Sequence, residues 1–345
     1  MPWDEGLVNS LVYEGPDPSE GRVLSYVKAV HEALSLALDH DPGVFVLGQG
    51  VDDPSAMFGT TRGLQEAYGR ERVFDTPVAE ESMTGICTGA AMNGMRPVYM
   101  HNRPDFILLA FNQLVTHASK FHFMDNGQTT VPMVIWAAIG RGWGSGSQHS
   151  QAIQGLLMGV PGLKIVMPST PADAKGLLLS SIADNNPVLF FEHRWLMKKD
   201  GIVPEGFYQV PLGKGVYRRR GTDVTVVGAS HAIELAGQAA NQLAQEGIDA
   251  EVIDLRTLKP LDEAIIEESL SKTGRLVVVD TGWQMGGVCA EIGCLAAEKW
   301  WHLLKAPVRR IGLPDIPTPA GFTLEQFYYP NVDRMKTVMR SLVHR

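Results

Sequence analysis

The sequence has little cysteine and no long apolar run. Its 3 cysteines, Cys87, Cys289 and Cys294, show neither Cys-x-x-Cys nor His-Cys metal spacing, which argues against a disulfide framework and a zinc site. No apolar run reaches the roughly 20 residues that cross a bilayer. Residues 1–21 lack the positive start and apolar core of a signal peptide. We therefore predict a cytoplasmic protein without a membrane partner, whose cysteines are small buried side chains.

Basic surface is also scarce. The formal net charge is -8, and the one compact basic run, Arg218 to Arg220, precedes a Gly-Thr-Asp turn. Because such a charge repels a phosphate backbone, nucleic acid is not expected as a partner. Hydrophobic residues make up 45% and charged residues 20%, as in ordinary globular proteins. A chain of 345 residues favours about two domains.

The usual phosphate-binding loops are missing. No Gly-x-Gly-x-x-Gly follows a predicted strand, and there is no Gly-Lys-Ser/Thr loop. The nearest candidate, residues 140–146, has glycine at every second position and leads to a histidine instead of a long helix. Nicotinamide and nucleoside triphosphate chemistry therefore lose most of their support.

Apolar residues alternate between helical and strand-like spacing along the chain. The first cycle predicts helices at 25–39, 106–118 and 172–182 and strands at 43–48, 97–100, 132–137 and 188–191. A second cycle predicts strands at 224–228, 250–254 and 275–280 and helices at 231–246 and 261–271. Alternation of this kind predicts mostly parallel sheets covered by helices, the α/β class.

Charges, prolines and glycines interrupt this pattern between residues 198 and 211, as is typical of a connection between domains. We therefore predict an α/β domain at 1–197, a linker at 198–211 and a second α/β domain at 212–345.

The segment 75–81, Asp-Thr-Pro-Val-Ala-Glu-Glu, ends a strand-like stretch and precedes a helix of small and apolar residues. A carboxylate in this place lies partly out of water and is suited to sharing a proton with a heterocycle. Alternatively, Glu80 and Glu81 are simply acids at a helix start, where the helix dipole favours them. Position alone favours this second interpretation.

Several segments together resemble a known family. They are 75–94, 96–97 (Arg-Pro), 148–151 (Gln-His-Ser-Gln), 161–168, 171–177, 184–188, 254–262 and 282–292. In order and spacing, from about residue 24 to the C-terminus, they resemble the beta subunit of the decarboxylating dehydrogenase component of 2-oxo acid dehydrogenase complexes. This resemblance implies a pyrimidine-binding domain with a mostly parallel sheet, followed by a transketolase-type α/β domain.

The resemblance also implies roles for individual residues. Glu80 aligns with the carboxylate that bonds the aminopyrimidine of thiamine diphosphate, and Phe106 with the aromatic that stacks on that ring. His149 aligns with the histidine that meets the substrate or the acceptor. Without the resemblance, an aromatic at a helix start is core packing more often than not, and a loop histidine is usually solvated.

A partner chain follows from what the sequence lacks. The Gly-Asp-Gly stretch with a later asparagine, which holds the diphosphate and Mg²⁺, lies on the alpha chain in this family and is absent here. The resemblance therefore implies an alpha2beta2 heterotetramer that is inactive without alpha, and a lipoyl-bearing acyltransferase as acceptor. The loop at 181–186 resembles one whose backbone carbonyls bind potassium in some members, through Ser181, Ile182, Asp184 and Asn186; an ordinary Asp-Asn turn is the alternative.

Some positions depart from the family pattern. Gln49-Gly50 stands where a pair of acids is usual, residues 102–105 (Asn-Arg-Pro-Asp) precede Phe106, and residues 192–194 (Glu-His-Arg) replace a more acidic stretch. Arg103, His193 or Arg194 would suit an anionic sugar phosphate or carboxylate. Three functions stay open: acyl transfer to lipoamide after decarboxylation, non-oxidative transketolase-like or carboligase transfer to an aldehyde, and a non-catalytic binding protein.

Overall fold

The computed structural model describes residues 21–53, 55–141 and 144–343. The N-terminal stretch considered as a targeting signal, up to residue 20, and Gly142 and Trp143 of the glycine-rich run lie outside these residues. The chain divides into two units, Met1–Ile139 with Gly159–Leu212 and Gly140–Met158 with Gly213–Arg345. Residues 140–158 therefore cluster with the second unit, which no pattern in the sequence indicated.

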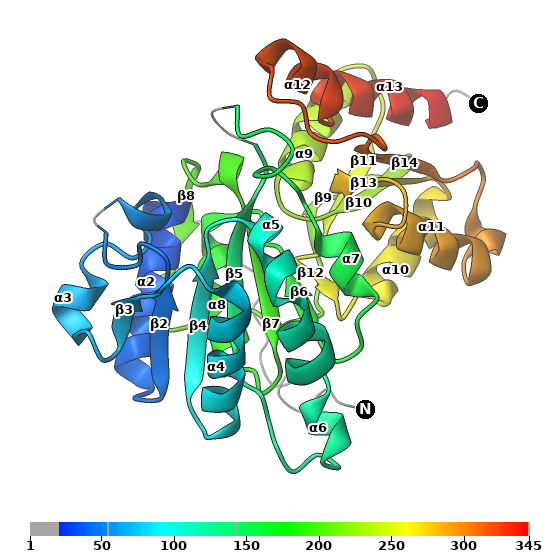
Figure 1. The fold of residues 1–345 in the computed structure, drawn as a ribbon. Coiled ribbons are helices and arrows are strands. Elements are labelled where there is room, and N and C mark those ends of the chain that lie inside the picture. Colours follow the sequence, from blue (N-terminus) through cyan, green and yellow to red (C-terminus); the bar gives the residue numbers. More distant parts are fainter. Residues whose placement is uncertain (1–20, 54, 142–143, 344–345) are drawn as a thin grey trace. The chain divides into compact units, whose positions relative to one another are not determined.

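A parallel sheet forms the centre of the first unit (Figure 1). Its strands are β2 (Val44–Gly48), β3 (Val73–Asp75), β4 (Arg96–His101), β5 (Val134–Ile139), β6 (Lys164–Val166) and β7 (Val188–His193). Within this unit they lie in the order β6-β7-β5-β4-β2-β3, each pair parallel. Every residue of β2, β5 and β7 is buried because helices cover both faces of the sheet, and these strands are apolar except for Glu192 and His193 at the end of β7.

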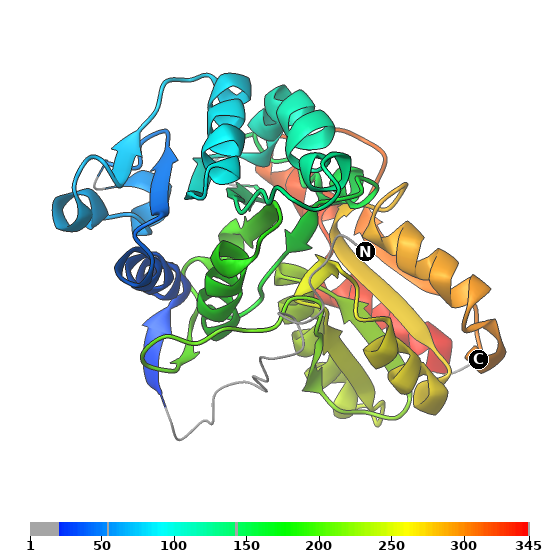
Figure 2. The ribbon, with the colours of Figure 1, turned by 90° about the horizontal axis from the view of Figure 1, so that it is seen from below.

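Helices lie on both faces of this sheet, as the view from below shows (Figure 2). On one face α2 (Tyr26–His40) and α8 (Pro171–Ala183) pack together over a core that includes Trp136 and Phe190. On the other face α4 (Glu80–Met92) packs against β4 and buries Met83 and Cys87. Smaller elements complete the unit: the antiparallel pair β1 (Arg22–Ser25) and β8 (Asp200–Val203), η1 (Ala56–Gly59), α3 (Leu64–Tyr68), α6 (Phe121–Met124) and η4 (Arg194–Leu196).

The helix predicted at 106–118 is not a single helix. It consists of α5 (Pro104–Ile107), the 3-10 turn η2 (Leu108–Ala110) and the π-helix η3 (Asn112–Ala118). Proline favours the first turn of a helix, so α5 begins earlier than predicted. The Ser119 N–H reaches the Leu114 carbonyl at 3.0 Å, a wide turn that apolar spacing does not reveal.

The second unit has a smaller sheet. Its strands β9 (Val216–Arg219), β10 (Val224–Gly228), β11 (Ala250–Asp254), β13 (Leu276–Trp283) and β14 (Arg309–Leu313) lie in the order β14-β13-β10-β11-β9, and only the edge strand β9 is antiparallel. Helices α9 (His231–Ala244) and α13 (Val332–Val343) share a core over this sheet. The other elements are α7 (Gln154–Met158), β12 (Thr257–Lys259), α10 (Glu263–Thr273), α11 (Val288–Glu298), η5 (Trp301–Leu303) and α12 (Phe322–Tyr328).

Predictions from composition can be compared with these elements. Cys87 and Cys289 are buried as predicted, but Cys294 is exposed, so its predicted burial is wrong. The buried positions of α11 are Val288, Cys289, Ile292 and Ala296, and Cys294 falls between them on the outer face. No helix within residues 21–53, 55–141 and 144–343 is long and apolar enough to cross a membrane.

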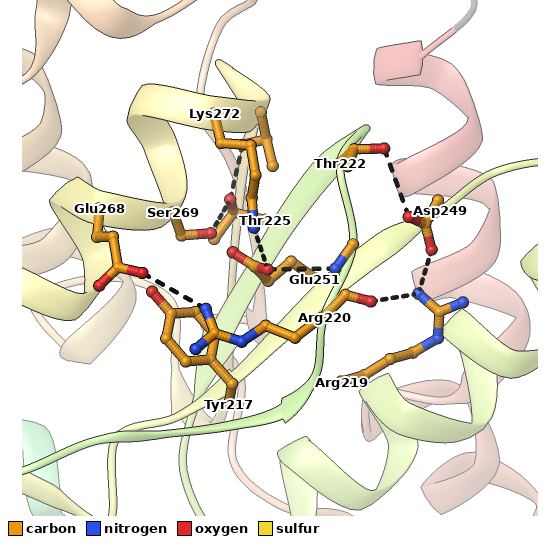
Figure 3. Close-up of polar contacts among 12 residues, drawn as sticks. Tyr217, Arg219, Arg220, Thr222, Thr225, Asp249, Glu251, Glu268, Ser269 and Lys272 are labelled. Carbon is orange, nitrogen blue, oxygen red and sulfur yellow. Dashed lines mark hydrogen bonds and ion pairs between the residues drawn. The ribbon is translucent and has the colours of Figure 1, made fainter.

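A fully buried carboxylate lies at the start of β11 (Figure 3). Glu251 Oε2 accepts a hydrogen bond from the Gly221 N–H at 3.2 Å and pairs with the Lys272 ammonium. Beside it, Arg220 lies over the Tyr217 ring and pairs with Glu268 at the surface. The two ion pairs differ mainly in burial, so they provide a matched comparison.

We expect Lys272→Met to lower the free energy of unfolding by about 3 kcal/mol, because it leaves the Glu251 carboxylate buried without its cation. Arg220→Gln removes a pair whose side chains are 63% and 66% exposed, and should cost less than about 1 kcal/mol. Urea unfolding at pH 7 measures both. If the two variants lose equally little free energy of unfolding, the buried Glu251 carboxylate does not depend on Lys272.

Candidate active site

Glu80 lies at the carboxyl edge of the first unit's sheet. It follows β3, is the first residue of α4 and is 6% exposed. Gln49, directly after the neighbouring parallel strand β2, donates a hydrogen bond from Nε2 to Glu80 Oε1 at 3.4 Å. The amino end of α4 favours a charged carboxylate there. A 3.4 Å contact is long, so it can give way to a stronger donor on a ligand.

At the same edge of the sheet lies an imidazole that sequence reasoning missed. His101 ends β4 and is 3% exposed, and its ring centroid is 4.3 Å from that of Tyr99. Neither ring nitrogen has a hydrogen-bond partner within the described part of the chain. Burial lowers the pKa of His101 to about 3, so the ring is neutral. Burial, with Cys87 and Glu80 nearby, raises the pKa of Tyr99. The feature of the sequence that could have indicated this residue is a histidine at the end of a buried strand.

Phe106 lies at the same edge, in the short helix α5 that follows β4. Its neighbours Asp105 and Ile107 are buried, whereas the Phe106 ring is partly exposed. A partly exposed ring beyond the strand ends can cover the face of a flat ligand. Its stacking on a pyrimidine stays a prediction.

Residues 192–194 (Glu-His-Arg), which depart from the family pattern, lie at the end of β7 and directly after it. Glu192 has no exposed surface, and burial raises its pKa to about 8, with the Trp136 indole acting in the opposite direction. Glu192 is therefore mostly neutral at pH 7. His193 is also fully buried and accepts a hydrogen bond at Nδ1 from the Trp195 N–H at 3.2 Å. Of the three, only Arg194 is partly exposed at the edge.

His149 belongs to the second unit, within residues 140–158. It is exposed, and its N–H reaches the Gly146 carbonyl at 3.4 Å, whereas the next residue, Ser150, is 1% exposed. The side chain can therefore meet a ligand while the segment beside it is anchored. Its catalytic role stays a prediction.

Contacts within the second unit hold the start of this segment. Arg141 pairs with Glu325, which is 3% exposed, and its guanidinium lies 5.7 Å and 5.6 Å from the ring centroids of Phe322 and Tyr329. A buried ion pair between aromatic rings is costly to break. Arg141 is thus fixed to α12 and to Tyr329, the residue that follows it.

A buried hydrogen bond anchors Gln154, which follows His149 in the same segment. Gln154 Nε2 donates to Asp280 Oδ1 at 2.9 Å, and both residues are buried. A Cβ on Gly282 would lie 2.7 Å from Gln154 Nε2, so glycine leaves the space for this contact. Burial raises the pKa of Asp280 to about 6 against the opposing effect of its hydrogen bonds. Nothing in the sequence indicated this hydrogen bond.

The predicted potassium loop lies at the end of α8. Arg96 Nη1 donates to the carbonyls of Ile182, Ala183 and Asp184 at 2.9, 3.1 and 3.1 Å. The Asp184 side chain pairs with Lys164 and accepts from the Asn186 N–H at 2.8 Å. A fixed guanidinium thus already contacts two of the four predicted carbonyl groups, and a potassium ion would have to share them. Within the described residues no three His, Cys, Asp or Glu side chains gather to hold a metal ion.

Two consecutive stretches of the chain match known families. Residues 22–199 match the family described as transketolase, pyrimidine binding domain, and residues 213–335 the one described as transketolase, C-terminal domain. The fold is similar to that of a chain described as "Split gene transketolase, inactive beta4 tetramer" (TM-score 0.75, 21% identity, 93% of this chain and 98% of that one). It is also similar to transketolase from Leishmania mexicana (TM-score 0.69, 16% identity, 99% and 48%). These two likenesses bear on the fold alone, and the predicted α/β class is confirmed.

The sequence is similar to that of several characterised subunits. It is 41% identical to the 2-oxoisovalerate dehydrogenase subunit beta of Bacillus subtilis (strain 168), over 93% of this chain and 98% of that one. It is 40% identical to the acetoin:2,6-dichlorophenolindophenol oxidoreductase subunit beta of the same organism, over 93% and 98%. Identity to the mitochondrial pyruvate dehydrogenase E1 component subunit beta-1 of Arabidopsis thaliana is 39%, over 92% and 89%.

The raised pKa of Asp280 predicts how stability depends on pH. The folded chain holds this proton more tightly than the unfolded chain, where the ordinary value is 3.8, so ionising Asp280 costs the folded state about 3 kcal/mol. This cost is absent at low pH and grows as pH rises from about 4 to above 6. Asp280→Asn keeps an oxygen that accepts from Gln154, so we expect it to raise the melting temperature at pH 8 but not at pH 4.

The melting temperatures of the two chains at pH 4 and pH 8 measure this effect. Asp52→Asn, at an exposed position, controls for the loss of one negative charge. A melting temperature that Asp280→Asn lowers at pH 8 would contradict the expectation.

Proposed function

This chain belongs to the family of the beta subunits of thiamine-diphosphate-dependent 2-oxo acid dehydrogenases, and from that premise we propose that Glu80 activates the aminopyrimidine ring of thiamine diphosphate. The enzyme decarboxylates a 2-oxo acid and transfers the acyl group to lipoamide. The observation that carries this proposal is the largely buried Glu80 carboxyl at the amino end of α4, held by a long hydrogen bond from Gln49.

The residues around Glu80 fit such a ring. Its carboxyl can share a proton with a ring nitrogen, and burial strengthens that hydrogen bond because little water competes. The partly exposed Phe106 ring would cover one face of the pyrimidine. Neutral His101, with both nitrogens available for hydrogen bonds, adds a polar group beneath the same edge. When bound, thiamine diphosphate supplies the electron sink for decarboxylation.

A partner chain completes the site. This sequence has no diphosphate motif, so the alpha subunit would hold the diphosphate and Mg²⁺ in an alpha2beta2 heterotetramer. Exposed apolar side chains on the α4 side of the sheet support such an assembly: Ile86 is 58% exposed, Leu109 60% and Phe123 82%. Apolar groups of this size gain free energy when a subunit covers them.

His149 would act on the substrate or on the acceptor. The two ties of its segment, Arg141 with Glu325 and Gln154 with Asp280, support this role because a group that moves a proton must be held in place. Acyl transfer to lipoamide also implies a lipoyl-bearing acyltransferase as a further partner.

Three smaller expectations stay predictions. Potassium would bind to the carbonyls of Ser181, Ile182, Asp184 and Asn186, beside the Arg96 guanidinium. The domain limits would be 1–197 and 212–345, joined by a linker at 198–211. The protein would work in the cytoplasm.

Transfer without oxidation is the second candidate function. In that case the acyl or two-carbon unit would pass to an aldehyde, as in a transketolase-like carboligase. The observation in its favour is that Arg103 follows β4 and Arg194 follows β7, at the carboxyl edge of the same sheet, since a phosphorylated aldehyde carries the negative charge that arginines bind.

Glu80→Gln tests the main proposal. We expect it to lower turnover of a 2-oxo acid by about 100-fold or more in the assembled alpha-beta enzyme, since an amide cannot share the proton. Glu81→Gln is the matched control, because Glu81 is the next residue of α4 but exposed. Calorimetric titration of thiamine diphosphate with Mg²⁺ should show binding to the pair and not to this chain alone. Equal turnover in the two variants would contradict the role of Glu80.

His149→Ala tests the acceptor. With 2-oxo acid and lipoamide we expect a fall of about 100-fold in rate, as for loss of a general acid or base. With a small artificial oxidant in place of lipoamide, the same variant should keep most of its rate if His149 serves transfer. An equal fall with both acceptors would place His149 in the decarboxylation step instead.

A further inference from the structure

A cavity of about 180 Å³ lies at the amino edge of the first unit's sheet, opposite the edge that carries Glu80. Val44 and Arg96, the paired first residues of the parallel strands β2 and β4, form part of its lining. A strand rises about 3.3 Å per residue, so the length of β2 separates this cavity from Gln49 by about 15 Å. The cavity therefore lies away from the residues of the candidate active site.

Apolar side chains form the walls of the cavity. Ala37 of α2 and Leu179 and Ile182 of α8 are buried and belong to the core between these helices. Ala183, the last residue of α8, is half-buried and lines the cavity beside them. An apolar cavity of roughly 150 Å³ holds a benzene ring. This cavity therefore has room for a single ring with a small substituent.

Two exposed rings also line the cavity and mark its open side. The Phe207 ring packs against the His40 imidazole, with 4.7 Å between the ring centroids and an angle of 31° between the ring planes. His40 ends α2, and Phe207 belongs to the linker predicted at 198–211. A flat ligand can extend this stack of rings, and an imidazole nitrogen can form a hydrogen bond with a hydroxyl group.

The charged groups of the cavity offset one another. Arg96 Nε pairs with Asp41 Oδ2 at 3.3 Å, and Arg96 Nη1 donates to the carbonyls of residues 182–184. Two further charges beside Asp41 are also of opposite sign: Arg72, which donates to the Asp41 carbonyl, and the exposed Asp39 of α2. Because this arrangement leaves no surplus charge for an ionic ligand, the cavity favours a neutral one.

We propose that this cavity is a second ligand site, which binds a small neutral molecule made of one aromatic ring with a hydroxyl group. The ring lies between the apolar walls of α2 and α8 and stacks on the pair formed by Phe207 and His40. The hydroxyl group reaches the His40 imidazole. Such a site goes beyond the proposed function, because it uses neither Glu80 nor thiamine diphosphate.

4-Fluorophenol is a suitable probe, because its fluorine NMR signal reports binding directly. It is titrated at pH 7 into the full-length chain assembled with its alpha subunit. We expect saturable binding with a dissociation constant of about 1 mM or below, as a ligand of this size can reach. The anion 4-fluorobenzoate, and cyclohexanol as a competitor that is not flat, should each bind about tenfold more weakly or worse.

Two substitutions in the lining test the position of the ligand. Ala183→Met fills the cavity and keeps the carbonyl that accepts from Arg96, so we expect binding to weaken by about tenfold or more. Phe207→Leu keeps an apolar side chain but removes the ring, which should weaken binding by about 3- to 10-fold. Ala297→Met, the same substitution at an exposed position of α11, is the control and should leave binding unchanged.

Absence of saturable binding to the unmodified complex would overturn the site, and so would binding that Ala183→Met leaves unchanged. If Ala183→Met does not assemble, Phe207→Leu decides in its place, because the Phe207 side chain is 42% exposed and the core does not depend on it. Equally tight binding of 4-fluorobenzoate would overturn the neutral class of ligand. Each of these measurements reports binding alone, so a failure of the thiamine proposal does not affect them.

Discussion

The parallel direction of the strands in the first unit brings the candidate site together. Carboxyl ends of parallel strands meet at one edge of a sheet, so residues far apart in the sequence gather there. Gln49 after β2, Glu80 after β3, His101 at the end of β4 and Arg194 after β7 all follow this rule. In an antiparallel arrangement alternate members of this group would lie at opposite edges.

Burial sets the charge of the groups gathered at this edge. His101 and Glu192 are both fully or almost fully buried, and the low dielectric keeps both neutral near pH 7. Glu80 is also largely buried, at the amino end of a helix. The edge therefore combines two groups that burial keeps neutral with the Glu80 carboxyl at the start of a helix.

The second unit includes residues 140–158, the segment that carries His149. Its buried pairs, Arg141 with Glu325 and Gln154 with Asp280, fix a segment that the chain order places inside the first domain. Breaking either tie would leave a buried polar group unsatisfied, which is a strong reason for the segment to stay in place. The exposed His149 lies between these two anchored positions in the sequence.

The sequence by itself determined the two-cycle α/β pattern and the carboxyl Glu80 before a helix. Apolar spacing reports burial directly, and strands at 224–228 and 250–254 are observed where they were predicted. Spacing does not report how a helix winds, so the break at 106–118 was missed. Tertiary structure alone decided that His101 is buried and neutral and that Asp280 accepts a hydrogen bond from Gln154. Each of these depends on distances between side chains remote in sequence, which only packing fixes.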